Sequence, residues 1–535
     1  MKKEEFKKYH EMSPFEVKDV LISLATESFK KNAKKSDKYL NAGRGNPNFF
    51  NTIVRDSFNY FSLFATHIAD VVSSFEHIAF RYTKENLYNK FLEYIQKQPQ
   101  TQAVLFLKKA VDFAIREYKF DPDEFLYEFA DGALGDFYPM PPRIFPHVEK
   151  ITLKYLEEVL CPDKHLPKGG YSIFATEGAT AAMIYIFNTL KYNKIINAQD
   201  HIAIMTPIFS PYLEIPMLGE FNLVEVKVEA DEFAKWQIPE KELNKLLDPS
   251  IKAVFLVNPT NPTGVAINDE TIFKIAEIVK TKRKDLIILT DTVYSTFVER
   301  FHSLIKEIPY NIICVYSFSK YFGVTGWRLG VILLHDDNIV DELIDNLKEA
   351  DKQEIERRYQ KVTTEPRKIR FMERLVFDSR DSALAHTGGL SCPQQILMAM
   401  FCLYELMDKE KKYKKDIHNI LKKRIKNLFE NLEIPEPEEE GNTYYYVLLD
   451  IAEVAKVKYG IDFKNYIIDK VDILEFLFRL AKEKFIVCLP GENFSGPKWS
   501  LRVSLANLEV EDYIIIGSAI TWLLESYYKE YQKNI

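Results

Sequence analysis

Lys320 is the residue of this sequence whose surroundings point most clearly to chemistry. It lies in the stretch Ser317-Phe318-Ser319-Lys320, directly after the apolar run 312–315, and Arg328 follows eight residues later. Burial disfavours the charged form of a lysine, and a neutral amine is the form that makes Schiff bases. The serine hydroxyls and the guanidinium of Arg328 are donors that a phosphate group prefers. The stretch therefore indicates Schiff-base chemistry beside a phosphate site, although a surface lysine after a strand is the competing interpretation.

A second phosphate-binding candidate lies upstream, at residues 176–182 (Thr-Glu-Gly-Ala-Thr-Ala-Ala). This stretch follows the apolar run 171–175 and opens a predicted helix. Small residues at a helix N-terminus leave backbone N–H groups free to hold phosphate, aided by the helix dipole. Gly178, Ala179 and Thr180 are therefore candidate phosphate ligands, although they could also form an ordinary helix cap.

Two further motifs follow apolar runs that are typical of strands. Residues 258–264 (Asn-Pro-Thr-Asn-Pro-Thr-Gly) follow the run 252–257, and their turn-forming residues make a structural turn the default interpretation. Asp291 ends the run 286–291, where an unpaired buried carboxylate would be costly, so we expect a cationic partner. A protonated ring nitrogen of a cofactor would be such a partner, and Tyr294 lies three residues further on. The competing interpretation makes Asp291 a cap of the next turn.

An arginine lies inside a predicted strand near the C-terminus, in Leu501-Arg502-Val503-Ser504-Leu505. Arginine forks onto planar anions through two parallel hydrogen bonds, so this position favours a carboxylate ligand. A structural salt bridge is the alternative that the sequence leaves open.

The elements that would position these residues alternate between strand and helix patterns from about residue 170 to 335. Apolar runs occur at 171–176, 201–206, 223–228, 252–258, 286–291, 311–317 and 327–334. Several are apolar on consecutive residues, as expected for strands covered on both faces. Amphipathic stretches such as 269–282 separate them. The pattern predicts a doubly wound α/β domain, which binds its ligands at the carboxyl ends of its strands.

The rest of the chain has a different pattern. Towards the C-terminus, helices mix with short strands near 444–449, 485–489 and 501–505, which predicts a smaller α+β domain. The N-terminal part is mainly helical, and the charge density of residues 340–380 favours a solvated pair of helices. We expect an N-terminal segment 1–60 that contributes to the small domain and the substrate site, a large domain 61–390 with helical insertions near 61–130 and 340–385, and a small domain 391–535.

Composition limits the classes of function. The 535 residues carry 71 basic and 78 acidic side chains, a net charge of −7, and the two signs are interspersed. The sequence has no basic stripe for nucleic acid and no run of about 18 apolar residues that could span a membrane. The charged N-terminus lacks the apolar stretch of a signal peptide, and the five cysteines show no metal-ligand spacing. We expect a soluble cytoplasmic protein with reduced thiols, no metal, and no nucleic-acid or membrane partner.

Taken in order, these motifs resemble those of the class I aminotransferases. The resemblance covers roughly residues 135–340 and 385–530 and implies a fold-type I enzyme that uses pyridoxal 5′-phosphate, with a large mixed-sheet domain and a smaller α+β domain. It implies that Lys320 is the catalytic Schiff-base lysine, that Asp291 pairs with the pyridinium nitrogen, and that Arg502 binds the substrate α-carboxylate. The other implied cofactor ligands are Gly178, Ala179, Thr180, Phe209, Asn261, Tyr294, Ser317 and Arg328.

Length and two other motifs narrow the resemblance. Ordinary class I aminotransferases are much shorter than 535 residues, and this chain has additional helical sequence. The stretch Ala-Gly-Arg-Gly-Asn-Pro-Asn at 42–48 resembles the family's substrate-lining strand, but it places Arg44 directly before Gly45. Gly-Asp-Phe-Tyr-Pro at 135–139 places Tyr138 where the neighbouring subunit's tyrosine meets the phosphate. Together these features resemble the aspartate 4-decarboxylases, which are bifunctional aspartate aminotransferases and β-decarboxylases.

This resemblance implies β-decarboxylation of L-aspartate to L-alanine and CO₂, with a side activity as aspartate:2-oxoglutarate aminotransferase. We expect Gly45, Asn261 and Arg502 in the substrate site, and Arg44 beside the β-carboxylate unless it is a surface turn residue. The shared tyrosine implies a homodimer or a larger homo-oligomer. One alternative is a plain class I aminotransferase acting on aspartate, alanine or aromatic amino acids. Another is a regulator with a degenerate aminotransferase fold, which the intact motifs and the lack of a basic helix-turn-helix segment argue against.

Overall fold

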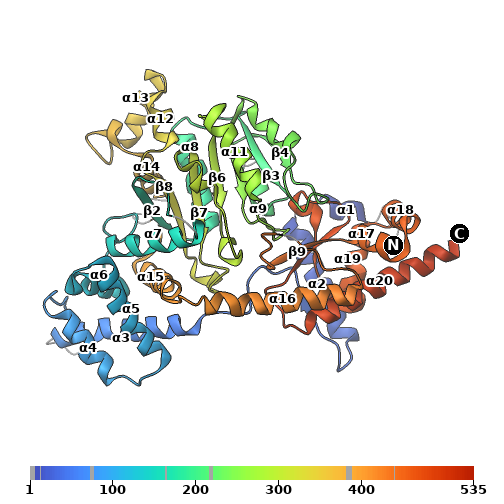
Figure 1. Cartoon of the computed structure of the whole chain (residues 1–535), viewed down its shortest axis with the longest axis horizontal. Coiled ribbons are helices and arrows are strands. Elements are labelled where there is room, and N and C mark those ends of the chain that lie inside the picture. The colour runs from blue at the N-terminus through green and yellow to red at the C-terminus, as the bar shows by residue number, and fades with distance from the viewer. Residues whose placement is uncertain are drawn as a thin grey trace.

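Three groups of elements lie next to one another along the long axis of the molecule (Figure 1). A sheet with its helices occupies the centre, a helical block lies at one end, and a region with the first and last helices lies at the other. The structure, a computed structural model, describes residues 6–12, 14–72, 78–162, 165–215, 221–380, 388–438 and 440–534. Within these residues, no helix is long and apolar enough to cross a bilayer.

The central sheet has seven strands among the described residues. They are β2 (Tyr171–Thr176), β3 (His201–Thr206), β4 (Val224–Glu229), β5 (Ile251–Val257), β6 (Ile287–Asp291), β7 (Ile312–Ser317) and β8 (Gly330–His335), in the spatial order β2-β8-β7-β6-β5-β3-β4. Strands β4, β3, β5, β6 and β7 are parallel, and β8 is antiparallel to both of its neighbours. All seven predicted runs are strands, so the predicted mixed, doubly wound sheet is confirmed.

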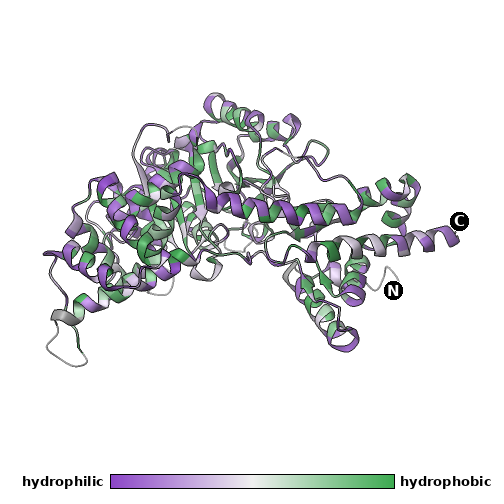
Figure 2. Cartoon of the chain, turned by 60° about the horizontal axis from the view of Figure 1, so that its bottom comes forward, coloured by the Kyte–Doolittle hydropathy of each residue, from purple (hydrophilic) through white to green (hydrophobic). Residues whose placement is uncertain are grey.

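Burial on both faces explains why these runs form strands. Every residue of β6, β7 and β8 is buried, as consecutive Ile, Leu and Val residues require. Figure 2 shows hydrophobic residues along the central strands and hydrophilic residues recurring along the surrounding helices. The start of β8 differs from the predicted residue 327, because Thr325–Trp327 form a 3₁₀ turn and Arg328 has a left-handed backbone with φ of 57°.

The charged segment after β8 forms three helices, α12 (Ile339–Asp345), α13 (Glu349–Tyr359) and α14 (Phe371–Asp378). The prediction of a solvated helix pair is wrong for α14, which packs against β2 and α8 (Ala179–Tyr192). The charges permit this because they pair internally: Arg358 forms an ion pair with Asp378 at 2.9 Å, and the Tyr359 hydroxyl donates to the same carboxylate at 2.8 Å. The predicted end of this insertion near residue 385 lies outside the described residues.

Among the described residues, four helices occupy the range of the predicted insertion near 61–130 and form a helical block. Its helices are α3 (Thr52–Val72), α4 (Leu87–Lys97), α5 (Gln102–Tyr118) and α6 (Pro122–Leu134). Their apolar faces meet in an aromatic core that includes Phe61, Phe64, Phe91 and Phe129. Helix α15 (Cys392–Met407) packs against this block and against α7 (Pro146–Leu160), so the block is anchored to the helices of the sheet.

The third region combines helices with two small sheets. A three-stranded antiparallel sheet has the order β11 (Leu489–Pro490), β12 (Ser500–Ser504) and β9 (Tyr446–Asp450), and β1 (Leu40–Asn41) pairs in parallel with β10 (Ile486–Val487). The helices are α2 (Pro14–Asn32), α17 (Ile451–Tyr459), α18 (Ile461–Lys470), α19 (Ile473–Lys484) and α20 (Asp512–Asn534), and the long α16 (Lys412–Leu432) connects this region to the centre (Figure 1). The β1–β10 pair brings the N-terminal segment into this region. The domain boundaries at residues 60 and 390 stay predictions.

Candidate active site

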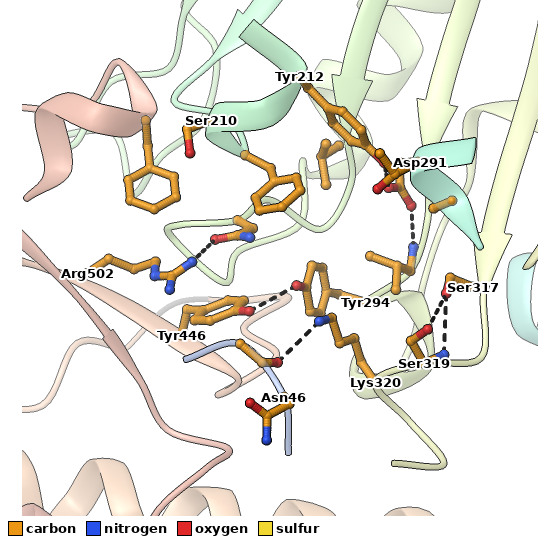
Figure 3. Close-up of a pocket in the computed structure, with 18 of the residues that line it drawn as sticks. Asn46, Ser210, Tyr212, Asp291, Tyr294, Ser317, Ser319, Lys320, Tyr446 and Arg502 are labelled. Atoms are coloured by element: carbon orange, nitrogen blue, oxygen red, sulfur yellow. Dashed lines mark hydrogen bonds between the residues drawn. The ribbon is translucent and has the colours of Figure 1, made fainter. Parts of the chain in front are cut away.

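A cavity of about 400 Å³ opens where the carboxyl ends of β5, β6 and β7 face the third region (Figure 3). This is the edge of the sheet where doubly wound folds bind ligands. The cavity brings together residues from distant parts of the sequence, from Lys18 to Arg502. The predicted site residues that line it are Gly45, Ala179, Thr180, Phe209, Asn261, Asp291, Tyr294, Ser317, Lys320, Arg328 and Arg502.

Lys320 projects into this cavity from the turn that follows β7. Its neighbours Phe318, Tyr321 and Phe322 are fully buried, so the turn is anchored by aromatic side chains while the lysine faces the opposite way. The Lys320 Nζ donates to the carbonyl oxygen of Gly45 at 3.2 Å. Among the described residues it has no ion pair with a carboxylate, which suits an amine that reacts with a carbonyl group.

Asp291 is the carboxylate of the site, at the end of the fully buried strand β6. One carboxylate oxygen accepts a hydrogen bond from the Tyr212 hydroxyl at 2.7 Å, and the other accepts from the Val293 N–H at 3.0 Å. Burial raises the pKa of Asp291 to about 6, and these two hydrogen bonds and nearby Lys320 oppose that rise. No lysine or arginine forms an ion pair with it in the described part of the chain. A cationic ligand group would supply the missing partner.

The N-terminus of α8 forms a cradle on the same side of the cavity. Gly178 caps this helix with φ of 92°, and a Cβ atom there would lie 2.6 Å from the guanidinium of Arg328. Only glycine therefore lets Arg328 approach the free N–H groups of the helix. The hydroxyls of Ser317 and Ser319 are hydrogen-bonded to each other at 3.0 Å at the end of β7. Helix N–H groups, an arginine and hydroxyls together fit a phosphate group.

Arg502 lies on the opposite wall, on β12, and is 3% exposed. It donates to the Asn261 side-chain oxygen at 3.3 Å and to the Gly43 carbonyl oxygen at 2.5 Å, while its Nε has no hydrogen-bond partner. The predicted alternative, a structural salt bridge, finds no carboxylate partner among the residues described. A buried guanidinium without an anion is costly, so the wall favours an anionic ligand.

Two predicted site residues lie away from this cavity. Arg44 is exposed and does not line it, although both neighbouring glycines do. Tyr138 is 66% exposed and lines a separate surface hollow with Cys392 and Gln394. The cavity of this chain does not by itself test the predicted roles of these two residues.

The sequence interpretation missed several lining residues. Lys18 enters the cavity from α2, Tyr212 from the short helix α9 (Ser210–Glu214), and Tyr446 from β9. Tyr446 and Phe494 hold their rings 4.7 and 4.9 Å from the Arg502 guanidinium. Tyr212 lies three residues after the predicted Phe209, which is the only local pattern that could have pointed to it. The others have no motif of their own.

Together these groups define a pyridoxal-phosphate site. A reactive amine, a buried carboxylate that lacks a cation, a phosphate cradle and an unpaired arginine occur in one cavity, and each fits one part of that cofactor or of an amino-acid substrate. The comparisons with known proteins agree. A family profile, Aminotransferase class I and II, matches residues 108–518, and the chain belongs to this family. It is accordingly a pyridoxal-phosphate-dependent enzyme of fold type I.

Individual relatives and structures are consistent with this assignment. The chain is 39% identical over 523 residues to the bifunctional aspartate aminotransferase and L-aspartate beta-decarboxylase of Pseudomonas sp, with 97% of each chain covered. It is 34% identical over 166 residues to the aspartate aminotransferase of Sulfurisphaera tokodaii, which covers 30% of this chain and 40% of that protein. A mutant aspartate aminotransferase of Thermus thermophilus matches the fold with a TM-score of 0.57 and 14% identity over 95% of this chain and 96% of the other. The aromatic aminotransferase of Pyrococcus horikoshii has a TM-score of 0.56 and 16% identity, over 94% and 99%.

Proposed function

We propose that this protein removes the β-carboxyl group of L-aspartate as CO₂ to give L-alanine, and that it also transfers the amino group of aspartate to 2-oxoglutarate. One observation carries the amino-acid chemistry: Lys320, Asp291 and the unpaired Arg502 line the same cavity. The likeness to a bifunctional aspartate enzyme over 97% of both chains supports the choice of aspartate and of decarboxylation.

Residues on the cofactor side of the cavity allow the cofactor to accept electrons from the substrate. When bound, pyridoxal phosphate accepts the electron pairs of the bonds that break at the substrate's α- and β-carbons. Asp291 keeps the ring nitrogen protonated, because a buried carboxylate is stabilised by a cation at that position. The Lys320 amine carries the cofactor and, once released from it, takes the proton from the substrate α-carbon.

Phosphate and ring contacts follow from the same geometry. Gly178, Ala179, Thr180, Ser317 and Arg328 would hold the phosphate group at the α8 cradle. Phe209 lines the cavity beside α9, and Asn261 and Tyr294 line it beside β5 and β6, where they would contact the ring and its phenolic oxygen. These contacts fix the ring relative to the Lys320 amine.

The substrate side orients the amino acid. Arg502 would bind the α-carboxylate, since its guanidinium is buried and lacks an anion. Decarboxylation then requires the bond between the β-carbon and its carboxyl carbon to break, CO₂ to leave, and the β-carbon to take up a proton. A β-carboxylate held too tightly in the ground state would leave slowly, so we propose that Arg44 orients it from a distance without a bidentate grip.

The exposed residues support an assembly of subunits. We propose a homodimer or larger homo-oligomer in which Tyr138 reaches the phosphate of a second subunit's site, because this tyrosine is 66% exposed and outside its own cavity. We also propose a cytoplasmic location, which the five buried free thiols support.

Product analysis tests the function. Purified protein loaded with pyridoxal phosphate and given L-aspartate alone should release CO₂ and L-alanine in equal amounts. Adding 2-oxoglutarate should produce glutamate and oxaloacetate as a second pair. If aspartate gives no CO₂ and only the second pair forms, the protein is a plain aminotransferase, and decarboxylation is refuted.

A further inference from the structure

Tyr446 on β9 contacts one residue on the cofactor side of the cavity and one on the substrate side. Its hydroxyl lies 3.1 Å from the hydroxyl of Tyr294, which lines the cofactor side. Its ring lies under the guanidinium of Arg502, 4.7 Å from the ring centre, on the substrate side. Figure 3 shows Tyr446 between Arg502 and Tyr294, with Lys320 close by.

The hydroxyl contact is buried and sterically defined. Tyr294 and Tyr446 are 3% and 1% exposed, so water does not compete for this hydrogen bond. A Cβ atom at Gly45 would lie 2.6 Å from the Tyr446 hydroxyl oxygen, so glycine at this position gives that hydroxyl its room. Burial keeps the pKa of Tyr294 well above its ordinary value, so Tyr294 stays a neutral hydrogen-bond donor.

The ring contact is one of two that Arg502 makes. Phe494 lies 4.9 Å from the same guanidinium, so Arg502 is in cation–π contact with two aromatic rings. A contact of this kind is stronger in a desolvated site than at an exposed one. The rings also fix the plane of a guanidinium whose Nε has no hydrogen-bond partner.

We propose that Tyr446 is a positioning residue that acts on the cofactor through Tyr294 and on the substrate carboxylate through Arg502. The second half of this inference rests on the proposed role of Arg502 in substrate binding. In this structure the Tyr294 hydroxyl donates to the Tyr446 hydroxyl. When the Tyr294 hydroxyl turns to the cofactor's phenolic oxygen, this direction reverses and the Tyr446 hydroxyl donates to Tyr294. A hydrogen bond received by a donor strengthens the bond that it gives, so Tyr446 favours the ionised form of the phenolic group.

Three variants separate the two contacts. Tyr446→Phe removes the hydroxyl and keeps the ring, Phe494→Leu removes the other ring and keeps the hydroxyl pair, and Tyr446→Leu removes both contacts of Tyr446. The first measurement is the pH midpoint of the absorbance transition of the bound cofactor, taken without substrate. The second is the dissociation constant of succinate, a dicarboxylate that the enzyme cannot convert, read from the same absorbance.

Each variant has its own expected pattern. Tyr446→Phe should raise the pH midpoint by about half a unit, because the ionised phenolic group loses support, and should change succinate binding less than twofold. Phe494→Leu should leave the midpoint in place and weaken succinate about three- to tenfold. Tyr446→Leu should show both changes. Tyr294→Phe should shift the midpoint in the same direction and further.

Two controls distinguish a positioning role of Tyr446 from a structural one: the variant Tyr445→Phe and the thermal stability of each variant. Tyr445→Phe removes a neighbouring hydroxyl that donates to the Gly45 carbonyl at 2.8 Å, and it should change neither measurement in the pattern above. Equal effects of Tyr446→Phe and Tyr445→Phe, or a midpoint unchanged in Tyr446→Phe, would overturn the proposal. Loss of thermal stability and of bound cofactor alone would assign Tyr446 a merely structural role. Both measurements are independent of whether aspartate is decarboxylated, so a failure here differs from a failure of the proposed function.

Discussion

The two walls of the cavity differ in how completely their polar groups are satisfied. On the sheet wall, both oxygens of Asp291 accept hydrogen bonds, and the hydroxyl of Ser317 is paired with that of Ser319. On the opposite wall, Arg502 keeps an unpaired Nε and has no anion among the residues described. Within the described residues, the protein therefore holds the polar groups of the sheet wall in place and leaves only the charge of Asp291 without an ion-pair partner, whereas Arg502 on the opposite wall gains an anion only from a substrate.

The difference between the walls matches the two kinds of ligand: the cofactor, which stays bound, and the substrate, which enters and leaves. A cofactor that stays bound can be held by groups that the fold itself positions, at the ends of strands whose register is fixed. A substrate must enter and leave, and a wall with one unsatisfied cation provides affinity for a carboxylate without a competing carboxylate from the protein. The predictions below test whether each wall has its assigned task.

The largest effect should come from Lys320, which faces both walls. Lys320→Ala removes the amine that carries the cofactor and moves the α-proton, so turnover should fall more than about 10⁴-fold. The absorbance band that borohydride removes should also disappear. Borohydride reduction of the native enzyme followed by peptide mapping provides the check, and a label on any other lysine would contradict the assignment.

Substitution of Asp291 should have the next largest effect, and this effect should lie in kcat rather than in Km. Asp291→Asn keeps an oxygen for the Tyr212 hydroxyl but removes the charge that holds the ring nitrogen protonated. We expect a loss of about 10³-fold or more in kcat, equivalent to several kcal/mol of transition-state stabilisation. The Km for aspartate should change little, since the opposite wall is intact. A near-normal kcat would refute the role of Asp291 in electron acceptance.

The same variant should stabilise the cofactor-free protein. The pKa of Asp291 is raised from 3.8 to about 6 in the folded state, so the folded state binds this proton more tightly than the unfolded state does. The resulting destabilisation grows as pH rises from about 4 to 6 and is constant above that range. Asp291→Asn should therefore gain at most about 3 kcal/mol at pH 7.5 and about 1 kcal/mol at pH 4.5. Denaturant unfolding at both pH values tests this, and an equal gain at both would contradict it.

Arg502 should have a smaller effect on the rate constant and a larger one on substrate affinity. Arg502→Ala removes the only buried guanidinium in the described cavity lining, so kcat/Km for all amino-acid substrates should fall about 10²- to 10³-fold. Arg424 is a matched control because it is also 3% exposed, yet it donates to the Leu505 carbonyl and to Asn48 outside the cavity. Arg424→Ala should lower stability without this loss of affinity. Equal kinetic losses in both variants would mean that Arg502 is structural.

The contrast between the walls also explains what the sequence could predict. Asp291, Ser317 and Lys320 lie at strand ends, and a strand end is a local feature of consecutive apolar residues. The contacts of the opposite wall join distant residues: Tyr446 is 152 positions from Tyr294, and Arg502 is 241 positions from Asn261. No spacing rule reports such pairs.

The types of the secondary-structure elements could also be predicted from local patterns. The predictions failed where tertiary contacts determine how an element packs. The seven strands follow from runs of consecutive apolar residues, and all seven are present. The solvated helix pair near 340–380 was wrong because Arg358 and Asp378 neutralise each other, which lets α14 become buried. Charge density alone does not distinguish a solvated face from an internal ion pair.

The smallest expected effect comes from substitution of Arg44. This variant tests whether residues of the opposite wall alone determine the ratio of alanine to oxaloacetate. Arg44 is exposed and outside the cavity lining, so the proposed influence on the β-carboxylate would be electrostatic and would act through solvent. Arg44→Ala should change the ratio of alanine to oxaloacetate formed from aspartate about two- to fivefold, and 0.5 M salt should reduce this change by screening. Lys18 is the matched comparison, since it is also a cation near the substrate side but lines the cavity itself.

Lys18→Ala should weaken aspartate binding and should respond less to salt, because a cation beside bound substrate is less screened. Chromatography of both products, in low and high salt, measures the ratio directly. If Arg44→Ala leaves the ratio unchanged at both salt concentrations while Lys18→Ala changes it, then the β-carboxylate is controlled from inside the cavity. In that case Arg44 is a surface residue beside a turn, and the substrate wall acts only through groups that touch the substrate.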